Sequence, residues 1–453
     1  MNRLIYCLFA SFFIFLSCSK EKEFADKDEM LVSFPEDFSE AIEGCEILLT
    51  NEMYVSTTYK TGFYDDIEVS SKILRSPTDT VLPGSEEYYN LLLDDKYKKL
   101  KIRTNKTSLS DKNTLRLGSK ISKIKGVLSI EKSGYVITLT SDPVIYYSQR
   151  PGSEFEYNED IITVMSFNLD YYMASPSNWG KSNGAKTEAE FLRQSQKIIS
   201  ALHSAKADIY ALCEIEEGNY SVEYLVNELN KSLGRFSYKY IDTGDRDVTK
   251  YTKNTFIYNA DKIQPVLYCK TYNSNYLPLR HIFQGFMRTD GSDKFILSLN
   301  HFKAKTGNGT GSNSDMNDGQ GSYNAKRVQE AKDCLESIDD ISVFYDDKDV
   351  LAIGDFNSYS KEDPIQYFIS NNYTNEIQKY SPNGWSYSYG GYVGYLDHVL
   401  SSPSMSEKVI DSFPWDINSS EPACLDYHFT QSFDESFYRC SDHNPIITIL
   451  KIK

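Results

Sequence analysis

The chain from residue 161 onward alternates short apolar runs, typical of buried strands, with amphipathic helical patterns. Two such runs cover residues 161–167 and 208–213, and between them Thr187 and Glu190 form a capping box that starts a helix. The predicted core stripe of this helix is Phe191, Leu192, Ser195, Ile198, Ile199 and Leu202. Because neither a strand nor an amphipathic helix buries its apolar face alone, the alternation predicts helices packed over sheets, the α/β class.

Polar residues stand at the ends of these strands, where a hydrophobic core would not accommodate them. Further strands are predicted at residues 255–258, 295–299, 350–353, 395–400 and 446–450. The polar residues beside strand ends are Asn168, Glu214, Asn300, His301, Asp355, Asn357, Asp442 and His443. Each alone has an ordinary explanation, such as a turn for Asn168 or an exposed loop for His301. Together and in this order, they predict a site where strand ends converge at one edge of a sheet.

The residue types at these strand ends suit one chemistry. Glu214 and Asp442, with Asp355 as a third carboxylate and Asn168 as an amide, offer the oxygen ligands that Mg²⁺ or Ca²⁺ prefers. Two histidines supply proton transfer near neutral pH, and Asp397 is placed to hold one imidazole in a single tautomer. These groups predict metal-assisted attack of water on a phosphodiester.

The charge balance limits how such a protein binds a polyanion. The 453 residues include 48 Lys and Arg against 64 Asp and Glu, a formal net charge of −16. Nucleic-acid binding would therefore depend on metal ions and on a local patch, for which Lys181, Lys186, Lys303 and Lys305 are the candidates. Residues 306–321, rich in Gly, Asn, Ser and Asp, are either a substrate-side loop, an additional cation site or a solvated mobile loop.

The N-terminus carries a targeting signal. Residues 1–17 combine Arg3 with an apolar stretch too short to span a bilayer, and they lead into a lipobox-like Phe-Leu-Ser-Cys. This pattern predicts a bacterial lipoprotein lipidated at Cys18 and anchored in the outer membrane, with cell-surface exposure and the periplasmic side both left open; an ordinary secretory peptide is the alternative. Residues 18–37 predict a charged flexible tether, either a surface-export signal or a plain linker. We expect a monomer.

Residues 38–147 predict a separate, smaller all-β domain, because short strand-like runs alternate there with Gly, Asn and Asp turns. A polar linker over residues 148–160 joins it to the catalytic region, residues 161–453. No cysteine outside the signal has the spacing of a zinc site. Whether Cys424 and Cys440 pair in an oxidising compartment is left open.

In its strand-end motifs the chain resembles the endonuclease/exonuclease/phosphatase superfamily, which has the fold of pancreatic-type deoxyribonuclease. The motifs are Ser-Phe-Asn ending at Asn168, Cys-Glu-Ile-Glu from Cys213, Leu-Asn-His-Phe-Lys-Ala-Lys from Leu299, Gly-Asp-Phe-Asn from Gly354, Tyr-Leu-Asp-His from Tyr395 and Ser-Asp-His-Asn-Pro from Ser441. They lie in order within residues 161–453. The resemblance implies an α/β (α+β) two-layer sandwich flanked by helices, with the site at one edge.

A closer resemblance is to secreted bacterial extracellular nucleases with an additional N-terminal domain. It rests on Arg-Ser-Pro-Thr from Arg75, Asn-Thr-Leu-Arg-Leu-Gly from Asn113, Asp-Gly-Gln-Gly from Asp318, Glu-Asp-Pro-Ile from Glu362 and Trp-Asp-Ile-Asn from Trp415. This extends the likeness over almost the whole mature chain and implies an OB-like fold for residues 38–147. One departure is Asn444, where these relatives often carry Asp after the final histidine.

Position by position, the resemblance implies which residues bind the metal ion and the phosphate. Asn168, Glu214 and Asp442 would hold the metal, which is Mg²⁺ or else Ca²⁺ or Mn²⁺. Arg280 and Arg327 are further candidates for phosphate contact, although Arg327 suits a helix surface equally well.

The resemblance also implies the catalytic groups. Asp355 and Asn357 would orient the water and the scissile phosphate, and His301 would contact the phosphate or act on the acid side. Asp397 would partner His443, which would be the general base or its equivalent. The resemblance leaves open how the roles of base and phosphate clamp are shared.

These observations favour a metal-dependent endonuclease that hydrolyses DNA, with RNA as a second substrate. A sphingomyelinase, or a phosphatase acting on phosphoinositides or other small esters, would use the same chemistry on the same fold. A non-catalytic surface binding protein is the third hypothesis. A retired enzyme would lose its ligand residues first, and here all of them remain.

Overall fold

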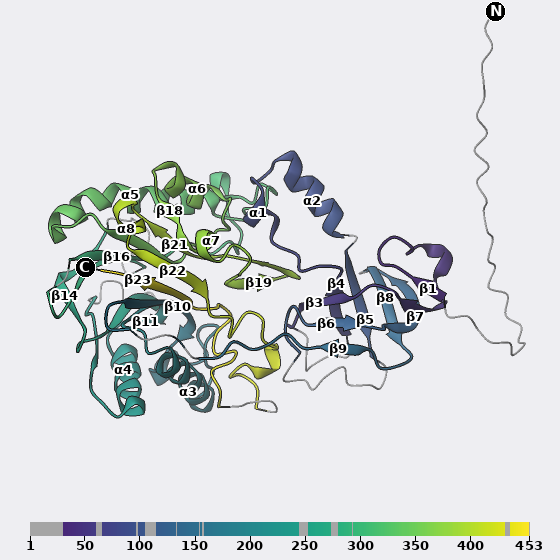
Figure 1. Cartoon of the computed structure of the whole chain (residues 1–453), viewed down its shortest axis with the longest axis horizontal. Helices are drawn as coiled ribbons and strands as arrows, with labels where there is room; N and C mark the ends of the chain where they lie inside the picture. The colour runs from purple at the N-terminus through teal and green to yellow at the C-terminus, as the bar shows by residue number, and fades with distance from the viewer. Residues whose placement is uncertain are drawn as a thin grey trace, which may run out of the picture.

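The computed structural model describes residues 30–59, 66–96, 98–104, 115–132, 134–153, 155, 158–243, 252–272, 280–291, 293–430 and 435–452. The predicted signal peptide, Cys18 and the first part of the tether lie outside the described residues. Figure 1 shows a large part that contains both helices and strands, and a smaller part built mainly of strands beside it. Among the described residues, no helix combines the length and the apolar character needed to cross a membrane.

Two six-stranded sheets form the centre of the large part. The first runs in the order β12 (Tyr238–Tyr240), β13 (Thr252–Asn259), β11 (Ile209–Glu216), β10 (Ile162–Tyr172), β23 (Ile446–Leu450) and β22 (Val409–Pro414). The second runs in the order β14 (Ile263–Thr271), β15 (His281–Arg288), β16 (Phe295–His301), β17 (Val350–Asp355), β21 (Asp397–Ser401) and β18 (Thr374–Asn375). In each sheet the two central strands that carry the motifs, β10 with β11 and β16 with β17, are parallel.

The two sheets pack face to face through an apolar core. Val164 and Ile209 of the first sheet meet Leu297, Leu351 and Val399 of the second in one continuous cluster. Every residue of β16 and β17 is buried. Strands covered on both faces carry continuous apolar runs instead of alternating ones, which is why the sequence shows them so clearly.

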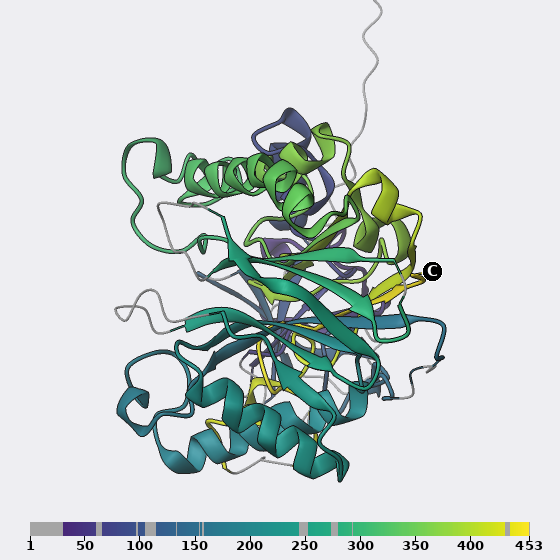
Figure 2. The ribbon, with the colours of Figure 1, turned by 90° about the vertical axis from the view of Figure 1, so that its left-hand side faces the viewer.

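Helices cover the outer faces of both sheets, as Figure 2 shows from the end of the sandwich. On the first sheet lie α3 (Glu188–Ala205) and α4 (Tyr220–Leu233), and on the second lie α5 (Asn324–Tyr345) and α6 (Asp363–Ser370). Two short helices, α7 (Glu376–Tyr380) and α8 (Pro403–Ser406), border β21 and β22. The predicted fold class, a two-layer sandwich flanked by helices, is confirmed.

Helix α3 begins where its sequence predicts. Thr187 is the N-cap, and its Oγ1 accepts a hydrogen bond from the backbone N–H of Glu190 at 3.3 Å. Of the predicted core stripe, Phe191 and Leu202 are buried, but Leu192 is 51% exposed. Successive helical residues point about 100° apart, so Leu192 lies outside the face that Phe191 buries.

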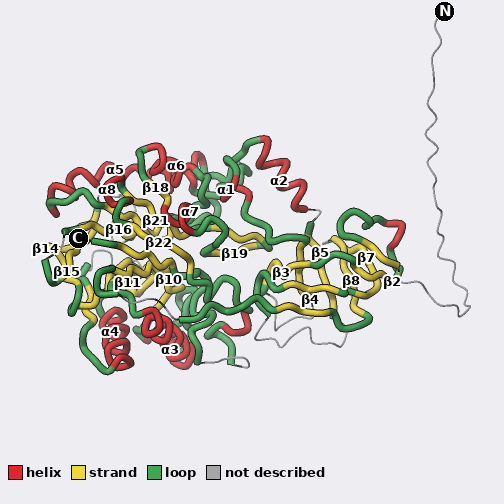
Figure 3. The backbone as a smooth tube through the Cα atoms, in the orientation of Figure 1, coloured by secondary structure: helices red, strands yellow, loops and turns green. Residues whose placement is uncertain are grey.

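The smaller part is a nine-stranded sheet that curls on itself (Figure 3). Its order is β1 (Met30–Val32), β2 (Glu46–Leu49), β7 (Lys125–Glu131), β8 (Gly134–Leu139), β5 (Lys99–Arg103), β4 (Asp66–Ser70), β3 (Met53–Thr57), β6 (Lys120–Ser122) and β9 (Val144–Tyr146). β3, β4 and β5 form a meander, β5 runs parallel to β8, and β6, which leads directly into β7, pairs back with β3. This strongly curled antiparallel and parallel sheet is compatible with the OB-like assignment, which stays a prediction.

The predicted boundary between tether and β domain lies too far along the chain. Strand β1 pairs in parallel with β2, so residues 30–37 belong to the β domain and not to the tether predicted over residues 18–37. The charged sequence before residue 30 masked this strand, which has only three residues and owes its order to its partner.

Residues 74–96 leave the β domain between β4 and β5 and lie against the sandwich. They include α1 (Pro77–Thr80) and α2 (Glu86–Lys96). The buried carboxylate of Asp79 accepts a hydrogen bond from Ser360 Oγ at 2.6 Å, and the backbone N–H of Ser76 donates to Val393 at 2.8 Å. This part of the N-terminal half therefore belongs structurally to the catalytic region.

Buried ion pairs fix the β domain to the sandwich. Arg116 Nε lies 2.6 Å from one oxygen of Glu421, and Arg150 Nη2 lies 2.7 Å from the other. Arg116 also reaches Asp416 at 3.1 Å. Because Glu421 is completely buried, both arginines are needed to offset the cost of removing its charge from water.

Candidate active site

The ends of five strands from both sheets meet at one edge of the sandwich. A cavity of about 580 Å³ opens there. Its strand-end wall consists of Asn168, Glu214, His301, Asp355, Asn357, Asp442 and His443. The structure thus brings the predicted site residues of distant segments into one cavity, with Asp397 directly behind His443. Their individual roles remain predictions.

Backbone strain gathers at this wall. Asp170, Tyr171, Glu214 and Asn357 all have positive φ angles, between 48° and 59°. The pairing of β10 with β11 also shifts register after Asn168. Such conformations cost of order 1–3 kcal/mol each and persist where the surrounding structure enforces them. Here they turn the side chains of the strand ends toward the cavity.

Carboxylates are crowded at this wall. Glu214 accepts a hydrogen bond from the Tyr171 backbone N–H at 3.1 Å. Burial, and the nearby charge of Asp442, raise the pKa of Glu214, although Arg280 partly opposes this shift. Burial and the charges of Asp442 and Glu214 likewise raise the pKa of Asp170 well above its usual range.

A divalent cation would relieve this repulsion. Among the described residues, the acidic and histidine side chains whose ligand atoms lie close enough together to hold a metal ion, within 4.8 Å of one another, are Asp355, Asp397 and His443 at the same wall. The carboxylate oxygens present suit such an ion.

Asp355 lies at the centre of the wall. Its Oδ1 accepts the backbone N–H of Asn357 at 2.8 Å, and its Oδ2 accepts the side-chain amides of Asn168 and Asn357, both at 3.2 Å. Burial raises the pKa of Asp355 to about 7, although His443, whose Nε2 lies 3.9 Å away, opposes the shift. Asp355 can therefore exchange a proton near neutral pH.

His443 is held by Asp397. Its Nδ1 lies 2.7 Å from Asp397 Oδ2, which leaves Nε2 facing Asp355 and the cavity. Burial by itself would lower the pKa of His443, but the charges of Asp397, Asp442 and Asp355 outweigh it and raise the pKa well above the usual value. The ring of Tyr387 packs against the imidazole with 4.7 Å between centroids.

The pKa of His301 is shifted in the opposite direction from that of His443. Its Nε2 lies 3.4 Å from Glu214 and 3.7 Å from Asp355. Burial and the positive charge of Arg280 nevertheless lower the pKa of His301 well below its usual value, so the ring is neutral at neutral pH. The site therefore holds one neutral and one protonated histidine on either side of Asp355.

The structure separates the two candidate arginines. Arg280 is half-buried beside the wall, and its charge acts on Glu214 and His301. Arg327 is fully buried, and its guanidinium donates to the backbone carbonyls of Ser322 at 2.8 Å and Gln320 at 2.6 Å. The predicted phosphate contact for Arg327 is therefore wrong; the residue holds the loop before α5 in place.

A loop wall faces the strand ends across the cavity and was not predicted. It consists of Ser76, Lys305, Thr306, Asp315, Gly319, Tyr359, Tyr387, Tyr389 and Tyr392. The hairpin of β19 (Tyr387–Tyr389) and β20 (Tyr392–Gly394) contributes three of the tyrosines and lies between the sandwich and the β domain (Figure 1). Its signal in the sequence is the alternation of tyrosines around Gly390 and Gly391, a tight turn.

The loop over residues 306–321 is anchored on the N-terminal segment. The backbone carbonyl of Asp318 accepts from Gly84 at 3.0 Å, and Gly319, with a φ of 95°, lies against Thr78 and Tyr88, where a Cβ would approach Thr78 to 2.5 Å. Of the three interpretations of this loop, its position in the cavity wall favours the substrate-side loop.

Only one of the four candidate lysines lines the cavity. Lys305 pairs with the buried Glu362, which also accepts a hydrogen bond from Thr78 at 2.7 Å. Lys181 and Lys186 are exposed elsewhere, and Lys303 lies over the ring of Tyr323. The predicted basic patch is therefore reduced to Lys305 and, beside the strand-end wall, Arg280.

Two further residues show why sequence reasoning was incomplete. Asp170 lines the cavity and was missed, because it follows Asn168 in what reads as the continuation of one strand. The side-chain amide of Asn444 donates to Asp416 at 2.8 Å and to Ser419 at 2.7 Å. A carboxylate at position 444 could not donate these hydrogen bonds and would repel Asp416.

The thiol of Cys440 donates to Asn418 Oδ1 at 3.4 Å, and no Cys424–Cys440 disulfide forms. Both cysteines are buried, so they contribute packing beneath the C-terminal segment that carries Asp442 and His443.

Comparisons with known proteins give one family model and several solved structures that resemble this chain. The family model described as the Endonuclease/Exonuclease/phosphatase family matches residues 165–443. A family member of that name from Bacteroides thetaiotaomicron is 17% identical, with 64% of this chain and 97% of that chain covered and a TM-score of 0.41. The human Nocturnin catalytic domain with bound sulfate is 14% identical, with 67% of this chain and 100% of that chain covered and a TM-score of 0.44. A mannosyl-6-phosphatase from Bacteroides thetaiotaomicron is 18% identical, with 63% of this chain and 98% of that chain covered and a TM-score of 0.42. No curated protein matches the sequence.

The assignment rests on the family model, which covers more than half of the chain and includes the strand-end wall from Asn168 to His443. Members of this family hydrolyse phosphoester bonds and generally depend on a divalent metal. The chain belongs to the endonuclease/exonuclease/phosphatase family.

Proposed function

We propose that this protein is a divalent-metal-dependent phosphodiesterase that hydrolyses DNA, with RNA as a second substrate. The observation that carries the proposal is the placement of two histidines around Asp355, beside crowded carboxylates: His301 Nε2 lies 3.7 Å and His443 Nε2 lies 3.9 Å from Asp355 Oδ2. One ring is suited to stabilise negative charge as a neutral donor, and the other is coupled to proton transfer.

The strand-end wall would hold the cation. Asn168, Glu214 and Asp442, with Asp170 beside them, are the residues whose oxygens suit Mg²⁺, Mn²⁺ or Ca²⁺. When bound, the ion would supply Lewis-acid polarisation of the phosphate.

The remaining groups orient water and move its proton. Asp355 would position the attacking water, and the proton would pass to the Asp355–His443 pair, which titrates as a unit. Asp397 would hold the His443 ring and stabilise its charged form. Neutral His301 would donate a hydrogen bond to the phosphate or to the leaving oxygen, and the amide of Asn357 would orient the phosphate.

We further propose that the mature protein is a monomeric lipoprotein anchored through Cys18 on the outer membrane and exposed at the cell surface. The lipobox-like sequence and the charged residues that follow it support this location. Metabolic labelling with a fatty acid tests it: label should enter the native protein and be absent from Cys18→Ala.

Nicking of supercoiled plasmid by the mature chain, with Mg²⁺ plus Ca²⁺ or with chelator, tests the proposed activity. We expect metal-dependent conversion to open circles, lost in Asp442→Asn. Asp411→Asn, an exposed aspartate on β22 far from the cavity lining, is the matched control and should remain active. If the plasmid stays intact while sphingomyelin or a phosphoinositide is hydrolysed, the proposed substrate would change from DNA to a smaller phosphoester.

A further inference from the structure

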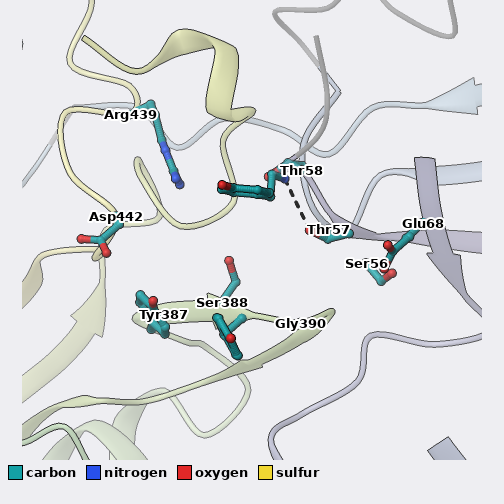
Figure 4. Close-up of a pocket in the computed structure, with 11 residues that line it drawn as sticks. Ser56, Thr57, Thr58, Glu68, Tyr387, Ser388, Gly390, Arg439 and Asp442 are labelled. Atoms are coloured by element: carbon teal, nitrogen blue, oxygen red, sulfur yellow. Dashed lines mark hydrogen bonds between the residues drawn. The ribbon is translucent and has the colours of Figure 1, made fainter. Parts of the chain in front are cut away.

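A second cavity, of about 600 Å³, lies between the β domain and the catalytic part (Figure 4). Its volume is within the range of small-molecule sites, roughly 300–1,000 Å³. It shares Tyr387, Tyr389 and Asp442 with the catalytic cavity, so the two are neighbours along one surface. Apart from Asp442, none of the residues that line this second cavity was predicted as a site residue.

The two ends of this interdomain cavity differ in chemistry. Arg439 and Asp442 lie at the end next to the catalytic residues, and Ser56 and Glu68 lie at the other end, in the β domain (Figure 4). The hairpin from Tyr387 to Gly390 forms the side between them. One end therefore offers a cation, and the other offers a carboxylate.

The cation of this cavity is the half-buried guanidinium of Arg439, whose Nη1 is held by the carbonyl of Asn418 at 3.0 Å. Its Nε and the Oγ of Ser56 are inaccessible to solvent, so neither atom can contact a ligand in the cavity. A ligand would therefore meet Arg439 through the accessible part of its guanidinium.

Aromatic faces are available as well. Tyr59 and Tyr389 line the cavity and are each 75% exposed, an unusual state for two large rings at one cavity. Stacking of a base on such a ring is worth about 1–3 kcal/mol and tolerates any base.

We propose that the interdomain cavity binds a nucleotide of the substrate strand next to the scissile phosphate. Arg439 contacts its phosphate, Tyr59 or Tyr389 stacks on the base, and Glu68 accepts a hydrogen bond from the base edge. The assignment rests on the proposed nuclease function and deepens it. A base must leave its helical stack to enter this cavity, so the preferred substrate is single-stranded nucleic acid.

The test uses the full mature chain and two substrates. One is a short single-stranded DNA with a fluorescent end label; the other is bis(p-nitrophenyl) phosphate, which is too small to span both cavities. We expect Arg439→Gln and Tyr59→Ala each to lower the ratio of kcat/KM for DNA to that for the small ester by about tenfold. The controls are Arg235→Gln and Tyr146→Ala, exposed residues outside both cavities, which should leave the ratio unchanged.

Binding provides a readout that needs no turnover. In chelator, where DNA is not cleaved, fluorescence anisotropy should show about tenfold weaker DNA binding for the same two variants. A mononucleotide should compete with the DNA in the native protein, and phosphocholine should not. Tyr59 is exposed, so its replacement reports on binding even if Arg439→Gln lowers the thermal midpoint.

The outcomes separate the two proposals. A native protein that hydrolyses neither substrate with metal present would refute the nuclease function, and the anisotropy would still test the cavity. Hydrolysis of both, with ratio and affinity unchanged in Arg439→Gln and Tyr59→Ala, would overturn the cavity assignment. Competition by phosphocholine in place of the mononucleotide would overturn it too.

Discussion

The strand-end wall and the loop wall of the catalytic cavity are built on different principles. The strand-end wall places charged groups at the ends of buried central strands such as β16 and β17, where burial shifts the pKa of Asp355 to about 7 and neighbouring carboxylates raise that of His443. The loop wall consists of tyrosines, one lysine and a segment of the N-terminal half, held by ion pairs and hydrogen bonds between distant segments. The first wall is suited to chemistry, and the second is suited to selecting what reaches it.

The largest effect is expected at the strand-end wall. His443→Ala removes the proton-transfer group and should lower kcat by about 10²–10⁴-fold, measured on the plasmid or on the small ester. His428 offers a matched control, because its Nδ1 also lies 2.7 Å from an aspartate, Asp426, but outside the catalytic cavity. Equal losses of activity in His443→Ala and His428→Ala would show that the loss is not specific to the His–Asp pair in the catalytic cavity. The special role assigned to the strand-end wall would then be unsupported.

The junction between the β domain and the sandwich, which lies outside the catalytic cavity lining, should respond first in stability. Glu421→Gln leaves Arg116 and Arg150 without their shared buried carboxylate, and a broken buried pair costs about 3–5 kcal/mol. We expect a lower midpoint in urea unfolding, together with a loss of activity on DNA that exceeds the loss on the small ester. Glu407→Gln, at an exposed carboxylate, is the control. An unchanged midpoint would mean that the β domain is not held through this pair.

We expect a divalent metal ion to stabilise the folded protein only by binding at the strand-end wall. A ligand at 100 times its Kd adds about 2.7 kcal/mol to the free energy of unfolding. Mg²⁺ or Mn²⁺ should therefore raise the thermal midpoint of the native protein, and Glu214→Gln should abolish most of this rise. A full rise in Glu214→Gln would place the ion elsewhere.

The smallest effect concerns pH in the metal-free protein. The folded pKa of Asp355 is about 7, against an ordinary value of 3.8, so between these limits only the folded state keeps this proton. A proton held only by the folded state stabilises it, and this stabilisation is lost as the pH rises through about 7.

In chelator, the thermal midpoint of the native protein should therefore fall between pH 5.5 and pH 8 relative to that of Asp355→Asn, which cannot titrate at this position. The difference should be a few degrees, since about 1 kcal/mol corresponds to roughly 2–4 °C for a domain of this size. Parallel curves for both proteins would show that Asp355 titrates normally.

Much of the catalytic half could be predicted because its strands are buried on both faces. Their apolar runs mark the strand positions, and a polar residue that follows such a run, as Glu214 follows residues 208–213, marks the rim. Arg327 failed this reasoning. Its candidacy for phosphate contact came from the resemblance, with an exposed helix surface as the alternative, but α5 buries this residue against its own preceding loop.

The sequence by itself determined where the main strands lie and which polar groups follow them, because these depend on local apolar patterns and on motifs within a few residues, and the family resemblance carried by those motifs implied the sandwich. Tertiary structure alone decided that His301 is neutral and His443 protonated, since those states depend on burial and on charges from other segments. It also decided the loop wall and the interdomain cavity, where residues from 56 to 442 meet. Contacts between segments so far apart in the chain leave no local pattern from which they could be predicted.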